Sequence, residues 1–294
     1  MFNRKEAVSW HCIKIIILIF SFLFLANKCF CQEKIILRYK PAKSDILQYR
    51  IILDNSIEKK DIASAKAERT LVDQNMTIDY TQEVKNTSNK TIKAVNTISF
   101  FSISMKKGEK KYSVPKELPD EILGKKFIFS MKDVGQILDF SPPQDLSEAP
   151  FSIDILSSIF EHIYPILPEK DIKIGSSWLA NFEISAPKPA EGKIFSSFNY
   201  TLSGVEKIGN TTCAVITYWG TFRSYLENKL GNKNKEINII GSSEGKTLIA
   251  IDNGKIIKAD EKMTLNIISE ITSEKSAIEH NQHTIKTDIS LELK

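Results

Sequence analysis

Apolar and polar residues alternate with a period of two over most of the chain. In the first such run, Leu47, Tyr49, Ile51 and Leu53 alternate with more polar neighbours. The same alternation recurs along the sequence in the ranges 76–80, 92–105, 126–131, 195–202, 212–222, 237–251, 262–271 and 284–293. Period-two alternation is typical of antiparallel strands that turn one face to a core and the other to solvent. The pattern therefore predicts a mainly β protein.

The segments between these runs are rich in Asn, Gly, Lys and Ser, as turns are. The clearest of them is Asp252-Asn253-Gly254, between two short apolar runs. An Asn-Gly pair tolerates the positive φ angles of a type I′ turn. We therefore expect a tight hairpin of that type here.

One segment, 152–164, departs from the alternation. Its apolar residues follow helical spacing and are Ile155, Leu156, Ile159, Phe160 and Ile163. Ser152 is a suitable N-cap, and Pro165 stops the helix. The sequence thus predicts a short amphipathic helix, which either fills a core or covers an apolar cleft. In the second case its five apolar residues are the candidate ligand-binding residues.

The two halves of the chain resemble each other on either side of this helix. Asp79-Tyr80-Thr81 corresponds to Asn199-Tyr200-Thr201 at an offset of 120 residues, and 133–138 corresponds to 252–257 at 119. Repeated strands and turns arise by chance in any antiparallel protein, but the nearly constant offset favours a duplication. We therefore expect two successive antiparallel β lobes of the curved-sheet or half-barrel type.

The expected domains follow from these features. A first β lobe occupies 32–148, a helical connector occupies 149–172, and a second β lobe occupies 173–294. The two lobes could share one curved sheet.

Residues 1–31 have the parts of an export signal. Arg4, Lys5 and Lys14 precede an apolar run at 15–26, which is shorter than the roughly 20 residues of a membrane-spanning helix. We expect cleavage after Cys31, so that no permanent transmembrane span remains, although a retained anchor is an alternative. The expected location is the periplasm, the extracellular space or the cell envelope.

Charge and cysteine content narrow the function classes. The chain has 40 Lys and Arg and 36 Asp and Glu, of which the signal holds four and one, leaving 36 and 35. This balance argues against a nucleic-acid partner, which a strong basic excess would favour. Cys213 is the one cysteine left after cleavage and lies in a β-branched run, so we expect a buried thiol and no intramolecular disulfide.

Two motifs suggest chemistry. The stretch Gly241-Ser242-Ser243-Glu244-Gly245 matches the Gly-x-Ser-x-Gly nucleophile elbow, but the β-branched run after it is not the helix that the elbow needs. A hydrolase that uses Ser243 is thus the third and weakest hypothesis. His280 and His283 could offer two nitrogens to a metal, which is fewer than a zinc site needs. We expect no catalytic residues, no metal and no cofactor.

Short motifs in the second half carry a family resemblance. They are Lys173-Ile174-Gly175-Ser176-Ser177-Trp178, the stretch 204–213, and the stretch 245–263. Together they resemble an uncharacterised family of secreted bacterial β-repeat proteins, in which an Asp stands where this chain has Ser176. The resemblance implies paired β repeats and an export signal but no activity. The predicted curved sheets are also similar, at the level of fold, to periplasmic lipoprotein-carrier and sorting proteins.

The hypothesis that the sequence favours is a non-catalytic extracytoplasmic binding protein for an apolar or lipid-like ligand. The alternative is a structural or protein-interaction module of the cell envelope, with fully packed sheets and an envelope protein as its partner. An interior cavity would favour the first hypothesis, whereas a densely filled interior would favour the second. The oligomeric state is left open by the sequence.

Overall fold

The computed structural model describes residues 34–61, 69–112, 122–141, 164–185, 191–230, 233–273 and 276–294. All of the strands belong to the compact unit Ile36–Lys294. They are β1 (Ile46–Asp61), β2 (Arg69–Ser88), β3 (Thr91–Lys107), β4 (Lys110–Tyr112), β5 (Lys126–Lys132), β6 (Ile137–Ser141), β7 (Ser177–Ser185), β8 (Glu191–Ile208), β9 (Thr211–Leu230), β10 (Lys233–Ala250), β11 (Ile256–Ser273) and β12 (Ser276–Leu293). The prediction of a mainly β protein is confirmed.

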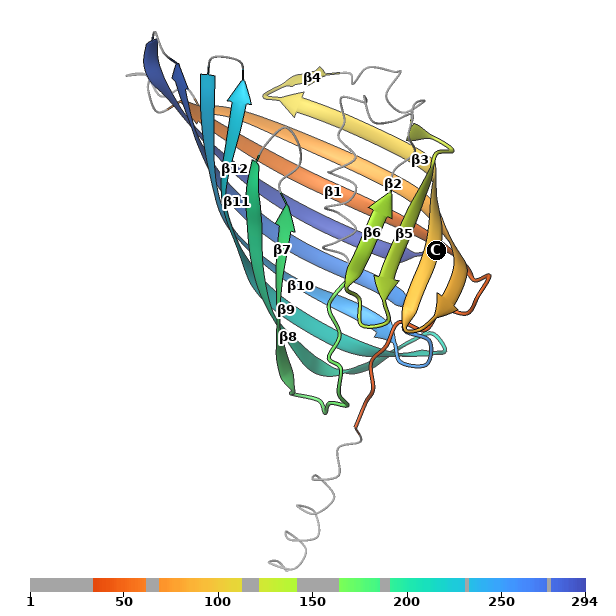
Figure 1. The fold of residues 1–294 in the computed structure, drawn as a ribbon. Coiled ribbons are helices and arrows are strands. Elements are labelled where there is room, and N and C mark those ends of the chain that lie inside the picture. Colours follow the sequence, from red (N-terminus) through yellow and green to blue (C-terminus); the bar gives the residue numbers. More distant parts are fainter. Residues whose placement is uncertain are drawn as a thin grey trace, which may run out of the picture. The chain divides into compact units, whose positions relative to one another are not determined.

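The strands form one 12-stranded antiparallel sheet in the order β6-β5-β3-β2-β1-β12-β11-β10-β9-β8-β7, with the short β4 paired to β3 (Figure 1). Strands that follow one another in the chain pair with each other, except β4 and β5, which both pair with β3, and β6 and β7, which are the two edges. The first and last strands of the chain, β1 and β12, also pair with each other in the middle of the sheet. They share 13 residue pairs, from Tyr49↔Leu293 to Asp61↔Asn281. Strands from both predicted lobes therefore share one open sheet.

The predicted helix and its five apolar residues, Ile155, Leu156, Ile159, Phe160 and Ile163, lie outside the described residues. The helix and its role in ligand binding therefore remain predictions. The export signal at 1–31 also lies outside the described residues.

One face of the sheet is apolar, and the strand register shows how it is built. A row of directly opposed residues crosses nine strands: Ile103, Met76, Leu53, Ile289, Glu261, Gly245, Tyr218, Tyr200 and Trp178. Because side chains alternate between the two faces of a strand, all members of this row share a face. We call this the apolar face. Along each strand, the residues that alternate with the apolar-face positions, such as Arg50, Lys246 and Lys262, form the polar face.

Two turns that lead into the sheet have matching hydrogen bonds. Ser44 and Gly175 have φ angles of 70° and 88°, and each precedes the first strand of one half of the chain. The Ser44 amide donates to the Val84 carbonyl at 2.8 Å, and the Gly175 amide donates to the Leu202 carbonyl at 2.7 Å. The predicted duplication stays a hypothesis, and these matching turns support it.

Extended chain at 37–40 and 164–168 crosses the turns at one end of the sheet. The Lys40 amide donates to the Asn253 carbonyl at 2.9 Å, and the Leu167 amide donates to the Val134 carbonyl at 2.7 Å. The two segments are linked by the Tyr39 hydroxyl, which donates to the Pro165 carbonyl at 3.0 Å. Four of their side chains are buried, namely Leu37, Tyr39, Tyr164 and Leu167. This end of the apolar face is therefore covered.

The β10–β11 hairpin confirms one part of its prediction and corrects another. Gly254 has a φ of 69°, but the φ of Asn253 is not positive, so the turn is not type I′. The Gly254 amide instead donates to the Ala250 carbonyl at 2.8 Å, which closes a longer loop. The pair with two positive φ angles is Asn89 and Lys90, at 51° and 60°, between β2 and β3.

Candidate functional site

The apolar face is the candidate site, and its covering changes along the strands. At the end near the crossing segments, its side chains are mostly buried, including the stacked rings of Tyr49 and Tyr80 at 5.3 Å. There the half-buried Trp178 stacks on the buried Tyr200 at 5.7 Å. Toward the other end, its side chains are only half-buried. These are mostly aliphatic or methionine: Ile57, Val72, Ile103, Met105, Ile237, Ile239, Met263, Leu265, Ile267 and Ile285. This half-buried apolar end can still bury area against a ligand.

Glu261 is a charged residue in the middle of the apolar face. Its directly opposed neighbours are Ile289 on β12 and Gly245 on β10, and only 5% of its surface is exposed. The Ser243 hydroxyl donates a hydrogen bond to Glu261 Oε1. Tyr218 on β9, which is opposite Gly245, is also close to the carboxylate. Burial first, and then the negative charge of Glu261, raise the pKa of the Tyr218 phenol well above its usual value. The sequence analysis missed Glu261.

Four further polar side chains on the apolar face lack hydrogen-bond partners. They are Asn96 on β3, Ser196 on β8, Ser224 on β9 and Thr247 on β10, and their polar atoms are buried. Asn96 and Thr247 are each 1% exposed. An unsatisfied buried polar group costs about 1–3 kcal/mol, so such groups call for a physical explanation. A ligand with polar atoms would supply partners.

The Gly-x-Ser-x-Gly stretch has a packing role in the sheet. A Cβ atom at Gly245 would lie 2.4 Å from the Tyr218 ring, and one at Gly241 would lie 2.4 Å from the Leu265 side chain. A third glycine on the same face, Gly220, has no Cβ atom and so leaves space for the Phe198 ring. These glycines let large side chains lie flat on the apolar face.

The same stretch lacks the geometry of a nucleophile elbow. Ser243 lies inside β10, which continues as a strand to Ala250, whereas the elbow requires a strand-to-helix turn. His283 is opposite Ile267 on β11, and Ser243 is opposite Met263 on the same strand. Along the strand direction, His283 and Ser243 are therefore four residues, or about 13 Å, apart. His280 lies farther along, at the level of Glu270. Among the described strands, the structure brings no histidine to Ser243.

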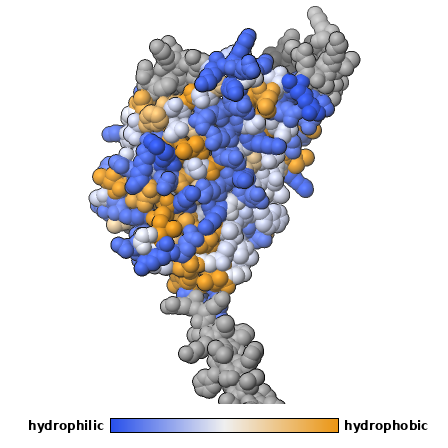
Figure 2. All heavy atoms as spheres, turned by 180° about the vertical axis from the view of Figure 1, so that it is seen from behind, coloured by the Kyte–Doolittle hydropathy of each residue, from blue (hydrophilic) through white to orange (hydrophobic). Residues whose placement is uncertain are grey.

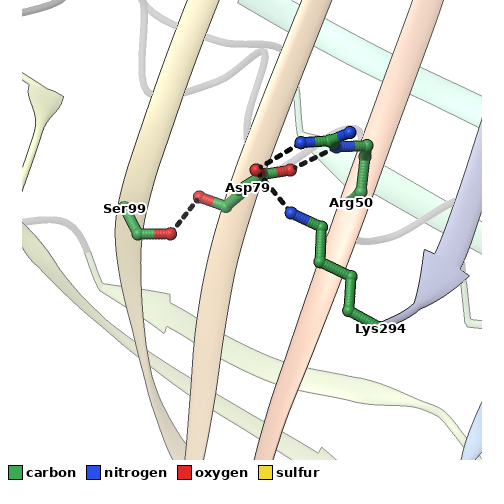
Figure 3. Close-up of polar contacts among 4 residues, drawn as sticks. All are labelled: Arg50, Asp79, Ser99 and Lys294. Carbon is green, nitrogen blue, oxygen red and sulfur yellow. Dashed lines mark hydrogen bonds and ion pairs between the residues drawn. The ribbon is translucent and has the colours of Figure 1, made fainter.

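The polar face carries an ion cluster around Asp79 (Figure 3). Asp79 is opposite Arg50 in the strand register, and Lys294 reaches the same carboxylate with an N–O distance of 2.6 Å. These hydrogen bonds, led by that from Arg50, lower the pKa of Asp79 below its usual value. A β-bulge places Ser99 beside it, where the hydroxyl donates to the Asp79 carbonyl at 3.3 Å. Since both basic partners are satisfied internally, the cluster ties β1, β2 and the end of β12 together.

Two grooves of about 1130 and 640 Å³ are lined mainly by residues of the polar face. Asp54, Lys262 and Asp288 line both of them. Acidic and basic side chains are mixed there, so neither groove selects ligands of one charge.

The other predicted chemical residues have structural surroundings. Within the described ranges, no three His, Cys, Asp or Glu side chains gather as a metal site would require. Cys213 is a free buried thiol that packs with Val215 and Leu248 in a small cluster. The part of the chain with assigned structure also contains no helix that is both long and apolar enough to cross a membrane.

No protein-family model and no curated protein matches the sequence. Among solved structures, the chain is similar to lipovitellin, in a structure concerned with lipid–protein interactions, at 11% identity and a TM-score of 0.52. That match covers 86% of this chain and 25% of the other, so this chain spans about a quarter of lipovitellin.

Two further matches have lower scores. OccK5 (OpdH) of Pseudomonas aeruginosa is 7% identical, with a TM-score of 0.23 and coverage of 84% of this chain and 99% of that one. A Bacteroides fragilis protein with a YmcC-like fold is 7% identical, with a TM-score of 0.19 and coverage of 84% and 97%. TM-scores this low do not show a shared fold. The chain therefore shares the fold of one part of lipovitellin, and the comparisons assign it no family.

Proposed function

We propose that this protein binds an apolar or amphipathic, lipid-like ligand against the apolar face of its sheet and catalyses no reaction on it. The observation that carries the proposal is the half-buried end of that face, where Met105, Ile239 and Met263 are incompletely covered. Among the described strands, the sheet is open between β6 and β7, so these strands do not seal the apolar face with a continuous hydrogen-bonded ring.

Two further features support ligand binding. The buried hydroxyls of Ser196 and Ser224 lie diagonally across β8 and β9, since Ser196 is opposite Phe222 and Ser224 is opposite Ile194. Pockets for small ligands commonly combine an apolar lining with a few polar groups that fix orientation. The similarity to lipovitellin, whose lipid–protein interactions were the subject of its structure, adds a precedent for such a sheet.

An extracytoplasmic location belongs to the same proposal. It rests on the basic residues and the short apolar run of 1–31. A binding protein in the periplasm or cell envelope would carry or sense its ligand there. N-terminal sequencing of the exported protein tests this part, and recovery of the uncleaved chain in the membrane fraction would contradict it.

Uptake of the fluorescent probe N-phenyl-1-naphthylamine tests ligand binding. Two adjacent residues of β10 provide a matched pair of variants, because Ile239 lies on the apolar face and Ile240 on the polar face. Ile239→Asp places a charge against the ligand and should weaken probe binding about tenfold or more. Ile240→Asp should leave it unchanged. No probe uptake by the wild-type protein, or equal effects of the two variants, would count against the proposal.

A second candidate function is protein interaction through the polar face. Four large hydrophobic residues form an exposed band across β8–β11: Phe195 (52% exposed), Tyr225 (49%), Ile240 (61%) and Ile268 (38%). Figure 2 shows hydrophobic patches among hydrophilic residues on the side of the molecule turned away from the view of Figure 1. Self-association is the form of this function that can be tested with the protein alone. Sedimentation should then show oligomers that Ile240→Asp dissociates, and a monomeric wild-type protein would remove this form of the candidate.

A further inference from the structure

We infer that Glu261, together with Ser243 and Tyr218, binds the ammonium head of an amphipathic ligand whose apolar chain lies on the apolar face. This inference rests on the proposed function and adds the chemical class of the ligand. The head group of that ligand must be both cationic and a hydrogen-bond donor.

The first argument is the lack of a basic partner for a buried carboxylate. Only 5% of the surface of Glu261 is exposed, and none of the ion pairs of the described residues includes it. Lys262 and Lys246, its closest lysines in the register, alternate with the apolar-face positions and so lie on the polar face. A buried ionised carboxylate is costly unless it is paired. The described part of the fold therefore retains an acidic group that none of its own basic residues neutralises.

The second argument is the number of hydrogen bonds that the carboxylate can accept. An ionised carboxylate offers about four acceptor positions. Ser243 supplies one donor, and the Tyr218 hydroxyl can supply a second. The remaining positions match an ammonium group, which carries several donors and a positive charge. Charge-assisted hydrogen bonds of this kind are stronger than neutral ones.

The third argument is the polar group beside Glu261. Thr247 is opposite Ala259, one step along the apolar face from the Gly245–Glu261 pair. Its hydroxyl is buried and without a partner, although it could accept a hydrogen bond from the same head group. Apolar residues surround these polar atoms, with Leu53 and Ile289 on one side and Ile216 on the other. A head group at Glu261 would therefore continue directly into contacts for an alkyl chain.

The opposite ligand charge fits poorly. A carboxylate head at this position would meet the negative charge of Glu261 in a poorly solvated environment, where like charges repel strongly. A neutral alcohol could donate only one hydrogen bond. The site should thus rank three ligands with the same alkyl chain in the order amine, alcohol, carboxylate.

Displacement of N-phenyl-1-naphthylamine by dodecylamine, dodecanol and dodecanoate tests this order. In the wild-type protein, dodecylamine should bind about tenfold more tightly than dodecanol, as expected for a hydrogen bond to a charged group. Glu261→Gln should reduce dodecylamine binding to the level of dodecanol, because the amide oxygen still accepts a hydrogen bond but carries no charge. The control is Glu244→Gln, which removes an exposed acid from the polar face of β10 and should preserve the order.

A second variant covers the case in which Glu261→Gln does not fold. Glu261→Leu replaces the buried charge by a residue like its neighbours, a change that is often neutral or stabilising. It should retain probe uptake and lose the preference for the amine. If the wild-type protein takes up the probe but binds the three ligands equally, or prefers dodecanoate, the inference is wrong while the proposed function stands. If neither the probe nor any of the three ligands binds, both are wrong.

Discussion

The guanidinium of Arg50 donates two hydrogen bonds to the carboxylate of Asp79, at 2.7 and 2.8 Å. The two residues are directly opposed on β1 and β2, and Lys294 adds a third donor from beyond the end of β12. Asp79 is 8% exposed, so its charge is held mainly by these two basic residues. The cluster joins the first strands of the chain to the last, at the place where β12 closes onto β1.

Asp79→Asn should therefore destabilise the protein. The variant keeps the size of the side chain but weakens the charge-assisted hydrogen bonds, which we expect to lower the free energy of unfolding by about 1–3 kcal/mol. Urea unfolding of both proteins at pH 7 measures the difference. Asp260→Asn is a suitable control because Asp260 forms its ion pair with Lys258 on the exposed surface, and it should change stability by less than about 1 kcal/mol. Equal effects of the two changes would contradict the role of Asp79.

The pH dependence of stability follows from the same cluster. Hydrogen bonding from Arg50 lowers the pKa of Asp79 in the folded protein, so the unfolded chain takes up this proton at a higher pH. The contribution of Asp79 to stability is therefore fully present above its unfolded pKa, and it is lost as pH falls through the lower, folded pKa. Melting curves between pH 6 and about pH 2 should show that Asp79→Asn loses less stability on acidification than the wild-type protein. Parallel pH profiles would exclude a contribution from this carboxyl.

Gly254 should tolerate substitution less well than another glycine with the same backbone conformation. A Cβ atom at Gly254 would lie 1.9 Å from the Arg38 carbonyl oxygen, whereas one at Gly209 would meet nothing within 4 Å. Both have positive φ, at 69° and 57°, so backbone strain is common to the two and costs about 1–2 kcal/mol. Gly254→Ala should then lower the melting temperature clearly more than Gly209→Ala. Similar melting temperatures would mean that the crossing segment at 37–40 contributes little to stability.

The strands could be predicted from the sequence because alternation reports directly which residues share a face. Leu47, Tyr49, Ile51 and Leu53 are all buried, as the pattern indicates. The closure of β12 onto β1 could not be predicted, because alternation specifies faces and leaves the pairing partner open.

The candidate site was harder to predict for a related reason. Ala259, Glu261 and Met263 occupy successive positions on one face, so an acidic residue at an apolar position was the signal that could have revealed Glu261. A single acid in such a run is ambiguous in sequence, because its burial depends on which strands lie beside it. The Gly-x-Ser-x-Gly pattern misleads for the opposite reason, since its glycines serve the packing of Tyr218 and Leu265.

Cys213 should behave as a packing residue with an unreactive thiol. It is fully buried against Val215 and Leu248, and desolvation, followed by the charge of Glu206, raises the pKa of its thiol. Because the thiolate is the reactive form, iodoacetamide should modify the native protein far more slowly than the urea-unfolded chain. Cys213→Ala should lower the free energy of unfolding by about 1–2 kcal/mol, since it removes one buried heavy atom and leaves a small void.

Cys213→Val is the matched variant, because it restores the volume with an apolar group that suits a strand, and it should cost less than Cys213→Ala. Probe uptake should be the same in both variants, since Cys213 lies one position out of phase with Ala214 and Ile216 of the apolar face. Rapid alkylation of the folded protein with loss of probe binding would instead place the thiol at a functional surface. Because Cys213 and Ala214 lie on opposite faces of β9, that result would require the strand pairing to open under native conditions.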